Sequence, residues 1–194
     1  VVIGTAPITS GNIAHVNMPI VANNYDEAVS PGGYSDEWDK YTLCQSIYAT
    51  FNVFKVAPLV LINVLDPAKD TSTASKEVTI VEGKAIVDDK GIVLKSVIVT
   101  SVNSPGTKYV QDKDYSVNIN SDGKVELDVI QAGAITETSL DVSYSALDAT
   151  KVTAEDIISG MDAIRQVYPR FNLVPGLIIA PGWSQNPEVE KALK

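Results

Sequence analysis

The sequence is poor in the side chains that build metal and redox sites: its 194 residues include one cysteine and one histidine. A single cysteine, Cys44, excludes a disulfide framework within the chain and fits a reducing compartment. It falls on the apolar face of an expected helix, where a thiol behaves as a small hydrophobic group rather than as an activated nucleophile. The lone His15 has no second histidine or cysteine beside it, so no transition-metal site is expected there.

Long apolar runs and clusters of basic residues are missing as well. The longest run, Val56–Leu65, is far shorter than the roughly 18 residues that a membrane-spanning helix needs. The net charge is −9. This balance argues against nucleic acid or an anionic membrane as a partner, because both require clustered lysine and arginine.

Both ends of the sequence fall inside an expected element of secondary structure. Val1–Ala6 opens directly as a strand, without the basic segment of a signal peptide. Lys194 falls in a helix that has barely begun. The sequence is therefore interpreted as a fragment of a longer protein.

What is present is an α/β pattern. Val56–Leu65 and Val174–Ala180 are apolar throughout, which is typical of strands buried on both faces of a helix-covered parallel sheet. Val1–Gly4 is predicted to be a third strand. Val16–Ala22 is predicted to be an edge strand, because Pro19 cannot donate a hydrogen bond to a neighbour.

Three helices are expected between and after these strands. The first begins at Ser35 or Asp36 and carries an apolar stripe as far as Phe54. The second begins at Thr153, whose spacing from Asp156 is that of a capping box, and Pro169 is expected to stop it. The third opens at Asn186-Pro187, with proline where its missing N–H costs nothing.

The pattern changes in the middle of the chain. Asp66–Lys76 is predicted to be a polar linker, and short runs rich in valine, isoleucine and threonine follow it at the spacing of a sandwich or small barrel. Tyr115–Val129 is the clearest hairpin. The expected runs are Glu77–Val81, Lys95–Val102, Tyr115–Ile119, Lys124–Val129 and Ser139–Tyr144.

The predicted organisation is therefore an incomplete α/β core with an inserted all-β domain. The core, a mixed or parallel sheet covered by helices, comprises residues 1–76 and 149–194. The insertion, a sandwich or small barrel, comprises residues 77–148. The predicted elements alternate as in an α/β layer. Their order is strand, helix and strand before the insertion and helix, strand and helix after it.

Four motifs touch on catalysis or ligand binding, and none is complete. Asn118–Gly123 begins like a calcium loop, but its twelfth position is Val129 instead of a bidentate glutamate. Gly4–Pro7 follows a strand but lacks the glycine and lysine pattern of a phosphate loop. Ser184 lacks the second glycine of a nucleophile elbow. The remaining candidates are carboxylates at turns and helix starts, where aspartate is usually solvated: Asp36, Asp39, Asp88, Asp89, Asp112 and Asp114.

From these motifs we expect no catalytic, cofactor-binding or metal-binding residue, no cofactor, and no enzymatic activity. An ordered set of segments nevertheless resembles a known family. Val2-Ile3-Gly4-Thr5-Ala6-Pro7 is followed by Asn17-Met18-Pro19 and, much later, by Thr153–Ala180 with its pattern Y-P-x-F-x-x-x-P-G, apolar strand and A-P-G. In this order the segments look like those of contractile tail sheath proteins of bacteriophages and prophages.

The resemblance implies a structural protein of the virion, assembled in the bacterial cytoplasm. Sheath subunits of this family stack as hexameric rings in a helical homopolymer around the tail tube protein, and the sheath contracts to drive the tube through the host envelope. Terminal arms that add strands to a neighbour's sheet link the subunits. This chain shows no such arms, so alone it is expected to be a monomer or weak dimer.

Two other classes of function stay open. One is an α/β enzyme with a β cap, which would use the loops after its parallel strands. The other is a surface-binding or carbohydrate-binding β module that would use aromatic side chains such as Tyr109 and Tyr115.

Overall fold

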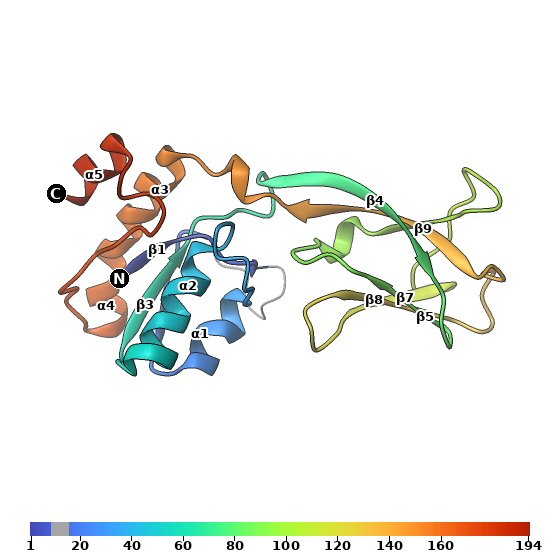
Figure 1. Ribbon diagram of the computed structural model, residues 1–194, viewed down its shortest axis with the longest axis horizontal. Helices are drawn as coiled ribbons and strands as arrows, with labels where there is room; N and C mark the ends of the chain where they lie inside the picture. Colours follow the sequence, from blue (N-terminus) through green and yellow to red (C-terminus); the bar gives the residue numbers. More distant parts are fainter. Residues whose placement is uncertain (9–15) are drawn as a thin grey trace. The chain divides into compact units, whose positions relative to one another are not determined.

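The computed structural model describes residues 1–8 and 16–194, which form two compact units. Unit 1 comprises Val1–Asp70 and Asp148–Lys194, and unit 2 comprises Thr71–Leu147. Figure 1 draws unit 1 with the blue and red ends of the chain and unit 2 in green through yellow to the orange of β9. Each unit has its own apolar core, so each is described separately.

Unit 1 contains a mixed three-stranded sheet. Its strands are β1 (Val2–Gly4), β2 (Pro19–Ala22) and β3 (Leu59–Asn63), in the order β1-β3-β2. β1 runs parallel to β3, and β2 runs antiparallel to it. The predicted strands at β1 and β3 are confirmed. β2 lies at an edge as expected, where the missing N–H of Pro19 is tolerated.

Helices pack on both faces of this sheet (Figure 1). On one face Leu59 and Leu61 share a core with Leu43 and Ile47 of α2. On the other face Gly160 of α3 lies against Ile3 and Val64. The helices of unit 1 are α1 (Tyr25–Gly32), α2 (Thr42–Tyr48), the π-helix Ala49–Phe54, the 3-10 helices Ala149–Lys151 and Asp162–Gln166, α3 (Ala154–Met161), α4 (Val167–Phe171) and α5 (Pro187–Leu193).

Two predicted helix boundaries are wrong and two are confirmed. The helix expected from Ser35 or Asp36 begins only at Thr42, and α1, which was not expected, precedes it. Pro169 does not stop its helix, because it lies in the first turn of α4, where its amide would have no intrahelical partner. The capping box of α3 and the helix start after Asn186 form as predicted.

The prediction of a continuous strand over Val174–Ala180 is wrong. Only Ile179 forms a bridge, parallel to Val2, with bonds from Ile3 N to Ile179 O and from Ile179 N to Val1 O, both 3.0 Å. Val174 is 79% exposed and Leu177 is 67% exposed. Pro175 has no N–H to donate and follows directly on Val174, so regular pairing begins late.

Unit 2 consists of two antiparallel three-stranded sheets. One contains β4 (Thr71–Thr79), β9 (Ser139–Leu147) and β6 (Ile98–Ser101), in the order β4-β9-β6. The other contains β5 (Lys84–Val87), β8 (Val125–Val129) and β7 (Tyr115–Ile119), in the order β5-β8-β7. A short 3-10 helix, Leu94–Ser96, precedes β6. Side chains of both sheets, among them Val99, Leu127 and Leu140, form one apolar core.

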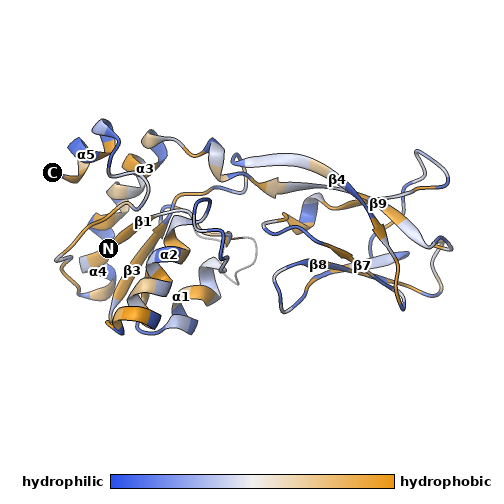
Figure 2. Ribbon diagram, viewed as in Figure 1, coloured by the Kyte–Doolittle hydropathy of each residue, from blue (hydrophilic) through white to orange (hydrophobic). Residues whose placement is uncertain are grey.

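No barrel is formed by the described residues of unit 2, so of the two expected alternatives the two-sheet arrangement is present. The hairpin Tyr115–Val129 is confirmed as β7 and β8, with Gly123 at φ 75° in the turn. The predicted linker Asp66–Lys76 is wrong in its second half, since β4 begins at Thr71 and pairs with β9 along its length. β4 is mostly white to blue in Figure 2, whereas β3 is orange. The polar composition of β4 is therefore typical of a linker, although the segment forms a strand.

Candidate functional site

The carboxyl ends of β1 and β3, where an α/β enzyme would place its ligand, are occupied by the protein's own hydrogen bonds. Asn63 is buried at the end of β3. Its Oδ1 accepts from Ala6 N at 2.9 Å and from Leu65 N at 3.2 Å, and its Nδ2 donates to Leu65 O at 3.4 Å. These bonds join the loops that follow the two strands.

The segment Gly4–Pro7 has a structural role at the start of α2. Thr5 Oγ1 accepts from Thr42 N at 3.1 Å, and Thr5 O accepts from Leu43 N at 3.0 Å. The first amides of α2, which would have to be available to a phosphate, are therefore bonded within the protein. Tyr41 supplies no side-chain cap to α2, and the buried Thr5, which directly follows β1, takes this role.

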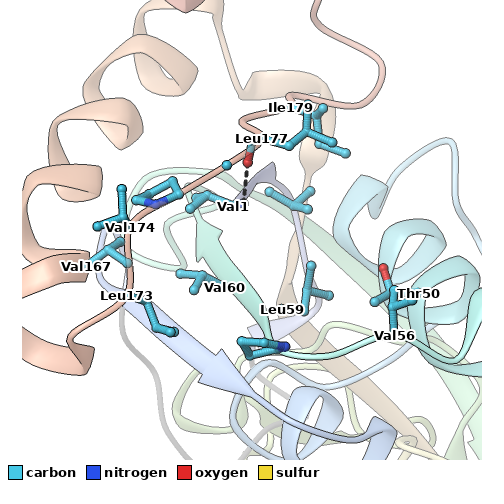
Figure 3. A pocket seen from close by; sticks show the side chains of 14 residues that line it. Val1, Thr50, Val56, Leu59, Val60, Val167, Leu173, Val174, Leu177 and Ile179 are labelled. Atoms are coloured by element: carbon cyan, nitrogen blue, oxygen red, sulfur yellow. Dashed lines mark hydrogen bonds between the residues drawn. The ribbon is translucent and has the colours of Figure 1, made fainter.

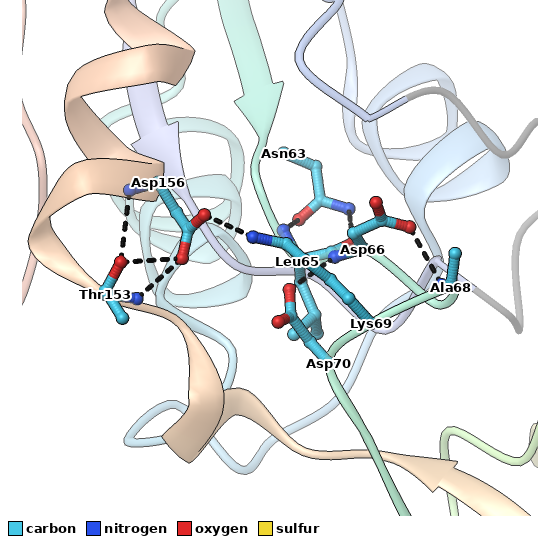
Figure 4. Close-up of polar contacts among 8 residues, drawn as sticks. All are labelled: Asn63, Leu65, Asp66, Ala68, Lys69, Asp70, Thr153 and Asp156. Carbon is cyan, nitrogen blue, oxygen red and sulfur yellow. Dashed lines mark hydrogen bonds and ion pairs between the residues drawn. The ribbon is translucent and has the colours of Figure 1, made fainter.

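A polar cluster holds the turn that ends the first segment of unit 1 (Figure 4). Asp66 N donates to Asp70 Oδ2 at 2.9 Å, and Ala68 N donates to Asp66 Oδ1 at 2.8 Å. Lys69 forms an ion pair with Asp156, the capping-box residue of α3. The cluster thus ties this turn to the start of α3.

Asp156 is held in its charged form. Burial alone would raise its pKa, but hydrogen bonds from Lys69 and from Thr153 keep the pKa below its ordinary value. The bond to Asp156 in turn raises the pKa of Lys69. The lysine side chain is 51% exposed, so the pair fixes geometry more than it adds stability.

The other motifs singled out in the sequence are also used structurally. Asn120 Oδ1 accepts from Asp122 N and Lys124 N, both at 3.0 Å, and so shapes the β7–β8 turn. Ser184 Oγ donates to Ala180 O at 3.0 Å. Cys44 is buried in α2, on the apolar face where it was expected. His15 lies outside the described residues.

The candidate carboxylates are dispersed rather than paired. Asp88 pairs with Lys124, and the lysine lowers the pKa of Asp88. N–H donors of Val110 and Ala134 lower the pKa of Asp114. Asp36, Asp39 and Asp112 lie in turns or bends. Within residues 1–8 and 16–194, no group of three or more histidine, cysteine, aspartate or glutamate side chains is placed to hold a metal ion.

Unit 1 contains an apolar recess of about 430 Å³ (Figure 3). No charged side chain lines it. Val1, Leu59 and Val60 supply the sheet side, and the segment Leu173–Leu177 closes the opposite side. We call this feature the recess; its lining residues are Val1, Val2, Thr50, Val56, Pro58, Leu59, Val60, Val167, Leu173, Val174, Pro175, Gly176, Leu177 and Ile179.

The recess lies at the amino ends of β1 and β3, because the residues that line it begin these strands. This is the edge of the sheet opposite to the one at which α/β enzymes bind ligands. Val56, Val174 and Leu177 are more than half exposed there, and nearby Phe54 is 70% exposed. Exposed apolar surface of this kind is typical of a contact with another protein or of a groove for an apolar ligand.

Ile178 faces a second hollow of about 390 Å³, between α3 and α5. Leu177 and Ile179 line the recess while Ile178 lines this second hollow, so side chains alternate along the segment as they do in a strand. The segment is apolar on both sides, as a strand inside a sheet would be, yet only β1 pairs with it among the described residues. On its other side, no strand of the described residues pairs with this segment.

The aromatic residues proposed for a binding module do not form an exposed platform. Tyr115 is 2% exposed and belongs to the core of unit 2. Tyr109 is partly buried, and its hydroxyl donates to Glu137. None of the described helices is long and apolar enough to cross a membrane.

These features define a two-unit protein, α/β in unit 1 and β in unit 2, with an apolar recess on unit 1. The search of curated proteins adds a relative: the chain is 27% identical to the tail sheath protein of Burkholderia phage BcepMu over 99% of its own length. The chain is a relative of a phage tail sheath protein, as the sequence motifs implied. It spans 40% of the length of that relative. No protein-family model and no solved structure matches the chain.

Proposed function

We propose that this chain is part of a structural subunit of a contractile phage tail sheath. In this proposal, copies of the subunit stack as hexameric rings into a helical polymer around the tail tube protein. The polymer then shortens and drives the tube through the host envelope. The protein has no catalytic activity and resides in the virion tail after assembly in the bacterial cytoplasm.

The observation that carries the proposal is the similarity over nearly the whole chain to a protein named as a tail sheath protein. The recess and the segment at Ile178, which pairs only with β1 among the described strands, add physical support, because exposed apolar surface and strands with an unpaired side are features through which subunits bind one another. The opposite edge of the sheet, where an enzyme would act, is filled by the bonds of Asn63 and Thr5. The enzyme and carbohydrate-binding alternatives gain nothing from the structure.

The complete gene product is expected to form tubes when it is expressed alone, because a sheath polymer is held together by contacts between its own copies. Negative-stain electron microscopy of the purified protein measures this outcome. A tail tube protein from the same genome should lengthen the tubes if it acts as their template. A complete gene product that stays monomeric at every salt concentration tested would contradict the proposal.

We further propose that unit 2 is an inserted domain that folds independently of unit 1. Its two ends meet, since Thr71 pairs with Leu147 in the β4–β9 ladder. The chain leaves and re-enters unit 1 at neighbouring points as well, where Asp148 N donates to Asp70 O at 2.7 Å. A short loop can therefore replace the insertion without stretching unit 1.

Replacing Thr71–Leu147 by a short glycine-serine loop is expected to leave unit 1 folded. Both tryptophans, Trp38 and Trp183, belong to unit 1, so their fluorescence reports on it alone. The shortened chain should retain the tryptophan unfolding transition of the whole chain, and residues 71–147 expressed separately should give their own cooperative transition in circular dichroism. Loss of either transition would show that the two units need each other to fold.

A further inference from the structure

Two exposed cations, here called the basic margin, lie close in the sequence to residues that line the recess, although the chain carries a net charge of −9. Lys55 directly precedes the recess residue Val56, and Arg170 lies in α4 between the recess residues Val167 and Leu173. Both side chains are exposed. Neither belongs to an ion pair in the described part of the chain. The apolar recess thus has two cations close to its lining residues in the sequence, and neither is paired with a carboxylate within residues 1–8 and 16–194.

Unit 1 also presents an acidic segment, residues 26–39. Asp26 and Glu27 lie in the first turn of α1, where the helix dipole favours negative charge. Three more exposed carboxylates follow, and one of them, Glu37, pairs with Lys40. The carboxylates of the acidic segment are Asp26, Glu27, Asp36, Glu37 and Asp39.

We propose that the recess and its basic margin bind the acidic segment of a second copy of this chain. This inference rests on the proposed function, which supplies the neighbouring copies. The two surfaces are different parts of one chain, so each copy can use both at once. A contact between unlike surfaces repeats head to tail and generates a ring or an open helical polymer, whereas a contact between like surfaces closes into a dimer.

The physical reason for choosing this occupant is charge complementarity around an apolar centre. Burial of Val174 and Leu177 supplies the driving force for contact, but it does not select a partner. Lys55 and Arg170 make the contact selective for an acidic partner surface, because opposite charges attract the partner and like charges disfavour other alignments of the two surfaces. Another copy of a chain with this charge balance offers carboxylates in excess.

Charge reversal in the complete gene product tests the inference. The double substitution Lys55→Glu and Arg170→Glu is expected to lower the yield of tubes at low salt at least tenfold. Adding Asp36→Lys and Asp39→Lys to the same chain should restore tubes, because each copy then again carries two complementary surfaces. Lys95→Glu with Lys108→Glu, which reverses two exposed cations of unit 2, is the matched control and should leave the yield unchanged.

Tryptophan fluorescence of each variant checks that unit 1 stays folded, and Leu177→Asp provides a second route to the same surface, with the same expected loss of tubes. Tubes that survive both Leu177→Asp and the Lys55/Arg170 reversal would overturn this inference and leave the proposed function standing. A loss that the acidic-segment substitutions do not restore would also overturn it, since the recess would then bind another partner. Absence of tubes from the unsubstituted protein would overturn the proposed function and this inference with it.

Discussion

Replacing Gly160 by valine is expected to destabilise unit 1 by about 3 kcal/mol, the upper end of the usual cost of overpacking. A Cβ at this position of α3 would lie 2.5 Å from Val64 Cγ1 and 3.1 Å from Ile3 Cγ2. Both neighbours are buried, Ile3 in β1 and Val64 directly after β3, so the helix would have to move away from these strands. The better helix propensity of a residue other than glycine offsets at most about 1 kcal/mol of this cost.

Denaturant unfolding followed by tryptophan fluorescence measures the effect, because Trp38 and Trp183 both lie in unit 1. Gly176→Ala is the matched control. It adds a Cβ at an exposed glycine with no other atom within 4 Å, and it should change stability by less than about 0.5 kcal/mol. Equal stability of the Gly160→Val protein and the unsubstituted protein would mean that α3 does not pack against the sheet at this point.

Asn63→Ala is expected to cost about 3 kcal/mol, because it leaves two amides without their acceptor in a buried position. Asn63 Oδ1 is the acceptor for Ala6 N and Leu65 N, and the side chain is 4% exposed. The two loops that follow β1 and β3 would lose the group that joins them. Because the position is buried, the Ala6 and Leu65 amides can bond to bulk water only if this edge of the sheet opens.

The same fluorescence measurement checks this result, with Asn52→Ala as the control in unit 1. Asn52 is exposed in the π-helix, so its replacement should shift stability by less than about 0.5 kcal/mol. Hydrogen exchange adds a local readout: the Ala6 and Leu65 amides should exchange faster in the Asn63→Ala protein. Unchanged stability together with unchanged exchange would contradict the role assigned to Asn63.

Local signals in the sequence predicted the elements that depend on local chemistry. The capping box Thr153/Asp156, the helix start at Asn186 and the turn at Gly123 form because each needs only residues a few positions apart. β3 was predicted because an uninterrupted apolar run has few alternatives to burial. The order of such locally recognisable segments along the chain also carries the family resemblance.

Pairing between distant segments could not be predicted in this way. β4 is polar and exposed along most of its length, and it is a strand because β9 pairs with it residue by residue. The segment Val174–Ala180 has the composition of a central strand, but it becomes an edge with one bridge. α2 begins at Thr42 because Thr5, in the distant segment that follows β1, accepts from its first amide.

The candidate site shows the same division most clearly. Composition by itself determined that metal, redox and nucleic-acid chemistry are unsupported, since the cysteine, histidine and clustered cations that such chemistry needs are scarce. The alternation of apolar runs determined the α/β character of unit 1 and the β character of unit 2. Only the tertiary structure decided that Val1, Leu59 and Leu177 line one recess, because that surface arises where three segments far apart in the chain meet at the amino ends of the parallel strands.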